Sequence, residues 1–205
     1  MDILKRLGDN PKLGDVRNIA KEIKKDHDLA MKLWATGQFH PRMLAILIMD
    51  KKQLSSTLVD SLFADMETHR YDERLQLADW LMANQLTKDN NLIALIMSWK
   101  DDAAPLKRRI YWYYQGRLRW MGKVQPNSAE LLPEIERHIA TESPEVQWAM
   151  NFTAGWIGIY EPGFRSRCIA IGENTGLFKD EMVSRGCTPN YLPEFIAIEA
   201  GKRNL

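Results

Sequence analysis

Apolar residues recur along this chain at intervals of three and four, which is the spacing of an amphipathic α-helix. Near the start, for example, Val16, Ile19, Ala20 and Ile23 share one helical face. The alternation typical of strands is almost absent. The pattern therefore predicts helices over residues 16–23, 28–36, 41–49, 54–66, 75–81, 92–97, 105–122, 128–142, 144–160, 164–174 and 192–200.

Proline and glycine mark the ends of these helices. Pro41 and Pro105 stand at first-turn positions, and Gly37 ends the helix before Pro41. Ser128 is expected to cap its helix, although Pro133 indicates a kink or a later start. About ten helices with short connectors predict an all-α fold in which helix pairs stack as a right-handed superhelix, a solenoid of the HEAT-like type. The sequence shows no repeat of fixed period.

Length and composition are those of one globular domain spanning residues 1–205, with 45% hydrophobic and 27% charged residues. The longest apolar run, residues 43–49, is far shorter than the roughly 20 residues of a membrane helix. The first residues lack the apolar stretch of a signal peptide, so we expect a cytoplasmic protein without a membrane partner. Cys168 and Cys187 are expected to be reduced thiols.

Charge is balanced overall at +1, but the segment 105–123 holds six basic residues, five aromatic residues and no acidic one. Cations neutralise phosphates and aromatic rings stack on bases, so this segment predicts a nucleic-acid surface. The expected DNA contacts are Lys107, Arg108, Trp112, Arg117, Arg119 and Lys123, with Arg165 and Arg167 extending the same surface. An ordinary solvated helix with basic side chains accounts for the same residues.

The helical wheel of this segment separates two groups of side chains. At about 100° per residue, Arg108, Arg109, Trp112 and Arg119 fall within one half of the helix. The other half is expected to fill the core through Ile110, Tyr114 and Leu118. The four histidines and two cysteines lack the close spacing of metal ligands, and no glycine-rich phosphate loop occurs, so no metal or cofactor is predicted.

Five segments together resemble the DNA alkylation repair enzyme family. They are residues 13–21 (LGDVRNIAK), 33–37 (LWATG), 41–45 (PRMLA), 145–152 (EVQWAMNF) and 186–196 (GCTPNYLPEFI). The resemblance implies a HEAT-like solenoid that holds double-stranded DNA, alkylated or not, and we expect a monomer. Active members of the family are glycosylases that release purines alkylated at N3 or N7. Such purines are cationic leaving groups, so the protein mainly stabilises positive charge on the deoxyribose.

The resemblance also implies a set of site residues. Trp80 matches the family's first aromatic residue, Arg109 its arginine (with Arg108 if the register differs by one), and Phe152 its last aromatic residue. Asn84 stands four residues after Trp80, where the family has an aspartate. The neighbouring Asp79 lies about 100° around the helix from Trp80 and is not expected to replace it.

An amide at position 84 leaves two functions open. One is a DNA-binding protein with weak or absent glycosylase activity, because Asn84 can orient water but cannot oppose a positive charge. The other is a non-catalytic scaffold that binds nucleic acid or protein. For the single residues, the alternatives are a core anchor for Trp80, a surface amide for Asn84 and a phosphate or solvent contact for Arg109.

Overall fold

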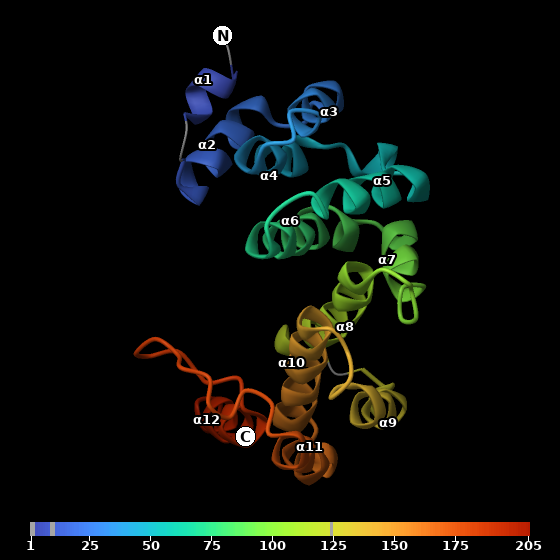
Figure 1. The fold of residues 1–205 in the computed structure, drawn as a ribbon, viewed down its shortest axis with the longest axis vertical. Coiled ribbons are helices and arrows are strands. Elements are labelled where there is room, and N and C mark those ends of the chain that lie inside the picture. The colour runs from blue at the N-terminus through green and yellow to red at the C-terminus, as the bar shows by residue number, and fades with distance from the viewer. Residues whose placement is uncertain (1–2, 9–10, 124) are drawn as a thin grey trace. The chain divides into compact units, whose positions relative to one another are not determined.

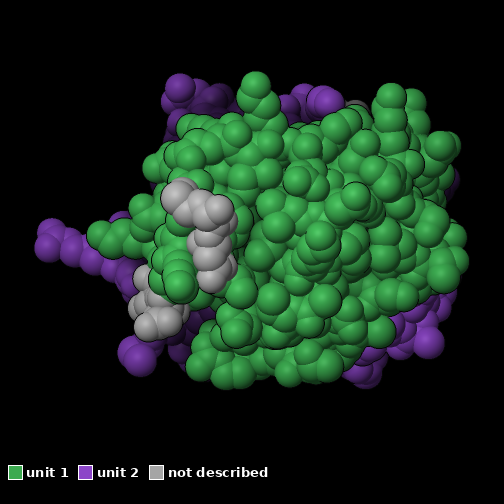
Figure 2. Space-filling model, turned by 90° about the horizontal axis from the view of Figure 1, so that it is seen from above, with its two compact units in different colours: residues 1–98 green, residues 99–205 purple. Residues whose placement is uncertain are grey.

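The computed structural model describes residues 3–8, 11–123 and 125–205, and all regular secondary structure in them is helical. The chain divides into two compact units, Met1–Ser98 and Trp99–Leu205, which Figure 2 colours separately. We call them unit 1 and unit 2 and describe each by itself. A single domain over residues 1–205 stays a prediction.

Unit 1 is a stack of helices in two layers (Figure 1). Helix α4 packs against α2, α3 and α6, and α5 packs against α6. As a result α2, α4 and α6 form one layer, with α3 and α5 beside it. The helices are α1 (Ile3–Leu7), α2 (Leu13–Ile23), α3 (His27–Trp34), α4 (Phe39–Ile48), α5 (Ser56–Met66), α6 (Tyr71–Asn84) and α7 (Asn90–Met97), with 3-10 turns at Lys51–Gln53 and Leu86–Lys88.

The apolar run at 43–49 is explained by the central place of α4. Met43, Leu44, Ile46 and Ile48 are all fully buried, because this helix has neighbours on several sides. A helix that contacts solvent along one face shows an apolar stripe, whereas a central helix is apolar nearly all round. The uninterrupted apolar run in the sequence therefore reflects the central position of α4 in unit 1.

Unit 2 is organised around α10 (Pro144–Tyr160), which packs against all the other helices of the unit. These are α8 (Pro105–Trp120), α9 (Ser128–His138), α11 (Pro162–Thr175) and α12 (Leu192–Gly201). Proline stands in the first turn of α8, α10, α11 and α12, where its missing N–H and fixed φ favour helix initiation.

The start of α9 differs from the expectation. Helix α9 begins at Ser128 and continues through Pro133, so the later start is wrong. Ser128 is the first helical residue and Asn127 the capping position, and the Ser128 hydroxyl donates to Glu161 Oε1 at 2.7 Å. A tertiary partner has replaced the local capping hydrogen bond. The helix predicted to start at Pro41 begins two residues earlier, at Phe39, so Pro41 does lie in the first turn of α4.

The other expected helices are present, and α1 was not predicted. It has only five residues, too few for a periodic apolar pattern. Cys168 is buried and Cys187 is exposed, and both are free thiols, as predicted. In the part of the chain that the structure describes, no helix is both long and apolar enough to cross a membrane.

Helices α8 and α10 approach each other closely at Gly116. A Cβ atom at this position would come within 2.5 Å and 2.9 Å of two Phe152 ring atoms. We expect Gly116→Ala to lower the free energy of unfolding by about 1–3 kcal/mol, because the two helices would have to move apart. Urea denaturation measures this loss.

A matched control is available in α2. A Cβ atom at Gly14, which is exposed and helical, would meet nothing within 4 Å. Gly14→Ala is therefore expected to raise stability by about 0.5–1 kcal/mol through helix propensity alone. Equal effects of the two substitutions would contradict the close packing of α8 on α10.

Candidate nucleic-acid interface

Trp80, on α6, ties together the α2–α4–α6 layer of unit 1. Its indole Nε1 donates to the carbonyl oxygen of Met43 on α4 at 3.2 Å. The guanidinium of Arg17, from α2, lies 4.8 Å from the centre of the indole ring, in cation–π contact. Trp80 is half-buried. It therefore anchors three helices and still presents part of its ring at the surface.

Asn84 lies one turn after Trp80, and its side chain is hydrogen-bonded to the Trp80 backbone. The side-chain Nδ2 of Asn84 donates to the carbonyl oxygen of Trp80 at 2.8 Å. Asn84 also lines a cavity of about 280 Å³, together with Arg17, Lys21, Ala20 and Leu47. The two charged residues in this wall are cations. The cavity therefore suits an anionic group such as a backbone phosphate.

Arg109, on α8, is buried inside unit 2, with only 4% of its surface exposed. Its Nη1 donates to the carbonyl oxygen of Glu145 at 3.2 Å. Its guanidinium lies 4.6 Å from the ring centre of Trp148 and 5.6 Å from that of Tyr113. The alternative of a solvent contact is thus wrong for Arg109, because two aromatic rings and α10 cover its charge.

Phe152 belongs to a row of aromatic side chains along α10. Trp148 and Phe152 stack with ring centres 5.3 Å apart and planes inclined by 15°. Trp156 and Tyr160 stack at 5.8 Å and 23°. These residues are four positions apart, so they meet on one face of the helix. The sequence prediction included Phe152 but not the row, although the four-residue spacing of Trp148, Phe152, Trp156 and Tyr160 is visible in the sequence.

The residues implied by the family resemblance are divided between the two units. Trp80 and Asn84 belong to unit 1, whereas Arg109 and Phe152 belong to unit 2. Within unit 1, Trp80 and Asn84 are joined by a hydrogen bond. Within unit 2, Arg109 and Phe152 flank the same side chain, Trp148.

Several cations expected to contact DNA are paired with carboxylates of unit 2. Arg108 makes a two-pronged contact with Glu142, at 3.1 Å and 2.8 Å. The ammonium group of Lys107 lies 3.5 Å from Asp102. These partners neutralise much of the positive charge that the sequence of α8 suggests.

Arg119 and Trp112 lie inside unit 2, which corrects the expected division of the α8 helix faces. Trp112 is 2% exposed, and the side chain of Arg119 is 0% exposed. Arg119 donates to Glu161 at 3.0 Å and to Ser128 at 2.6 Å. Burial lowers the pKa of Arg119, and the hydrogen bond to Glu161 opposes that effect. Both halves of α8 contain buried side chains, because α10 packs against this helix and Arg119 is enclosed by its contacts with Ser128 and Glu161.

Arg165 and Arg167 also have partners in the protein. Arg165 donates to the carbonyl oxygens of Gly158 and Ile159, at 2.9 Å and 3.0 Å, near the end of α10. Arg167 donates to both oxygens of Glu136, at 2.5 Å and 2.6 Å, and this hydrogen bonding lowers the pKa of Glu136.

Arg117 and Lys123 have no carboxylate partner within the residues that the structure describes. Arg117 lies 5.6 Å from the ring centre of Tyr113 and 5.2 Å from that of Trp120, which is 45% exposed. Lys123 is exposed just after α8. The end of α8 is therefore the part of this helix best suited to contact a phosphate and a base. No group of three or more metal-ligating side chains occurs among the described residues.

Comparison with known proteins identifies the class of protein. The sequence pattern of the DNA alkylation repair enzyme family matches residues 11–160. Because this region is well over half of the chain, the protein belongs to that family, as the resemblance suggested. Among curated proteins, none matches the chain significantly.

A solved structure shows the same fold. It was described as a new family of proteins related to the HEAT-like repeat DNA glycosylases with affinity for branched DNA structures. It is 22% identical to this chain, and the superposition, with a TM-score of 0.71, covers 95% of this chain and 82% of that one. The likeness confirms the predicted all-α, HEAT-like fold.

Proposed function

We propose that this protein binds DNA through cationic and aromatic side chains of its two units, and that base excision is weak or absent. The observation that carries the proposal is the cavity of unit 1, whose charged residues are the cations Arg17 and Lys21 and whose wall includes Asn84. Membership of the DNA alkylation repair enzyme family supports DNA as the polyanion.

Each unit contributes a different kind of contact in this proposal. In unit 1, Arg17 and Lys21 contact phosphates, and Trp80 keeps Arg17 in place by cation–π contact. In unit 2, Arg117 and Lys123 contact phosphates, and the exposed ring of Trp120 packs on sugar or base. These contacts read the backbone and the shape of DNA and carry little sequence information.

We further propose that branched DNA is preferred over a plain duplex. The support is the affinity for branched DNA structures described for the structurally similar family. Stacking platforms such as Trp120 favour DNA with accessible bases, and such bases occur where strands separate. The proposal predicts that a four-way junction competes for the protein more effectively than a duplex of equal length.

Fluorescence anisotropy titrations over a range of salt concentrations test this proposal. The logarithm of the association constant is expected to fall linearly with the logarithm of salt concentration. The double substitution Arg17→Ala with Lys21→Ala is expected to weaken binding to every DNA and to reduce the salt slope by about 2, because two phosphate contacts are lost.

Arg70→Ala is the matched control, since Arg70 is an exposed cation of unit 1 that pairs with Asp72 and Glu73. It should leave the slope unchanged. A double variant with an unchanged slope would overturn the role of the cavity. The absence of DNA binding at moderate salt would instead favour the alternative function, a scaffold for other proteins.

A further inference from the structure

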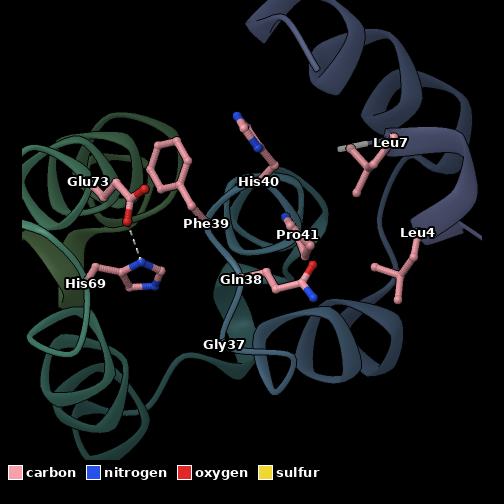
Figure 3. Close-up of a pocket in the computed structure, with 10 residues that line it drawn as sticks. Leu4, Leu7, Gly37, Gln38, Phe39, His40, Pro41, His69 and Glu73 are labelled. Atoms are coloured by element: carbon pink, nitrogen blue, oxygen red, sulfur yellow. Dashed lines mark hydrogen bonds and ion pairs between the residues drawn. The ribbon is translucent and has the colours of Figure 1, made fainter. Parts of the chain in front are cut away.

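A second cavity of unit 1, separate from the one beside Asn84, has a volume of about 510 Å³ (Figure 3). Its wall combines the first turn of α4, the leucines Leu4 and Leu7 of α1, and the side chains of His69 and Glu73. The volume lies within the range of small-molecule binding sites. The cavity contains none of the site residues implied by the family resemblance and none of the proposed DNA contacts.

The first turn of α4 offers unpaired hydrogen-bond donors to this cavity. The first hydrogen bond of the helix runs from the N–H of Arg42 to the carbonyl of Gln38 at 3.0 Å, and the Gln38 side chain does not cap the helix. Pro41 has no N–H. In the described part of the chain, the N–H groups of Phe39 and His40 therefore lack an acceptor. Together with the helix dipole they favour an anion.

His69 supplies an independent indication of a ligand. Its side chain is 6% exposed, and its Nδ1 lies 3.0 Å from Oε2 of Glu73. Its Nε2 is buried and has no hydrogen-bond partner among the described residues. In Figure 3 this nitrogen lies on the side of the ring turned away from Glu73. A carboxylate only accepts hydrogen bonds, so Nδ1 donates to Glu73, and in the neutral form of the ring Nε2 is then an acceptor.

The rest of the wall fits an organic group attached to the anion. The ring of Phe39 lies edge-on to His40 at 5.0 Å and to His69 at 6.3 Å. The ring of Phe39 and the two leucines of α1 are the apolar part of the wall, against which a flat group can pack. Arg70 offsets part of the negative charge of Glu73, because it lies 3.4 Å from Oε1, while Oε2 accepts a hydrogen bond from His69.

We propose that this cavity binds a phosphate monoester on a nucleoside-sized group. The phosphate oxygens accept from the N–H groups of Phe39 and His40, and the P–OH of the monoanion donates to Nε2 of His69. A phosphate monoester has a second pKa of about 6, so part of it carries this proton at neutral pH. Its source is either a free nucleotide or the 5′-phosphate end of a DNA strand.

NMR spectroscopy of the ¹⁵N-labelled full chain tests the proposal. The probes are inorganic phosphate, deoxyadenosine 5′-monophosphate, deoxyadenosine, and one short DNA strand with either a 5′-phosphate or a 5′-hydroxyl. The amide signals of Phe39 and His40 are expected to shift with phosphate and with the monophosphate but not with the nucleoside. A dissociation constant below about 1 mM is expected for the monophosphate. A response to the phosphorylated strand alone assigns the source to DNA ends, and a response to the monophosphate alone assigns it to free nucleotides.

Substitutions distinguish a loss of ligand binding from a loss of folding stability. His69→Phe keeps a ring but removes both nitrogens, and it is expected to weaken binding of the monophosphate at least tenfold. His138→Phe is the control, because His138 is an exposed histidine of unit 2. If His69→Phe does not fold, His69→Asn serves instead and is also expected to weaken binding, because its amide N–H can still donate to Glu73 but it has no counterpart of Nε2.

Two results would overturn this proposal. One is unchanged Phe39 and His40 signals with both the monophosphate at about 10 mM and the 5′-phosphorylated strand, and the other is unweakened binding by the folded variant. Because the cavity beside Asn84 uses other residues, the Arg17 and Lys21 experiment succeeds or fails independently of this one.

Discussion

Replacing Arg119 by methionine is expected to lower the free energy of unfolding by about 3–5 kcal/mol, the largest loss that we predict for a single side chain. The substitution leaves Glu161 without its guanidinium partner in a largely buried place. It also removes hydrogen bonds to Asn127 and Ser128 at the start of α9. Urea denaturation followed by tryptophan fluorescence measures the loss.

Arg137→Met provides the control for this prediction. Arg137 also pairs with a carboxylate, Glu134, but its side chain is 62% exposed and water can replace the lost partner. A loss of about 1 kcal/mol or less is therefore expected. The double variant of Arg119→Met with Glu161→Gln should recover part of the stability, because no buried charge is left unpaired. If Arg119→Met and Arg137→Met were equally mild, the burial assigned to Arg119 would be wrong.

The example of Arg119 shows why the helices could be predicted and the charged surface could not. Helix position follows from apolar residues a few positions apart, and such local patterns are visible in the sequence. The partners of Arg108 and Arg119 are 34 and 42 residues further along the chain. Counting six cations in one segment therefore overestimated the free charge of α8, since nothing local reveals which carboxylate folds back onto it.

The candidate site shows the same division between local and tertiary information. Trp80 and Asn84 are four residues apart in one helix, so their adjacency follows from local spacing, and a hydrogen bond joins them. The contact of Arg17 with Trp80 joins residues far apart in sequence. Their meeting depends on how α2, α4 and α6 pack, which the spacing of apolar residues does not determine.

Asn84→Asp is expected to create or strengthen excision of alkylated purines. Under single-turnover conditions, we expect the wild-type protein to release 3-methyladenine and 7-methylguanine no faster than they are lost spontaneously. The variant is expected to be about tenfold faster or more, since a missing electrostatic stabiliser typically accounts for a hundredfold to a thousandfold. The aspartate cannot donate to the Trp80 carbonyl as Asn84 does, so its charge is free to turn into the adjoining cavity.

Two further variants decide what the outcome means. Asn84→Ala loses the same hydrogen bond without gaining a charge, so it should stay inactive and thereby assign the gain to the carboxylate. Asp79→Asn tests the nearest acidic residue, a half-buried carboxylate directly before Trp80. The wild-type protein could instead excise alkylated purines and lose that activity on Asp79→Asn. Asp79 would then supply the catalytic carboxylate, and the amide at position 84 would not explain weak activity. If Asn84→Asp gains nothing while DNA binding is intact, position 84 is a binding position only, because restoring the charge there does not restore the chemistry.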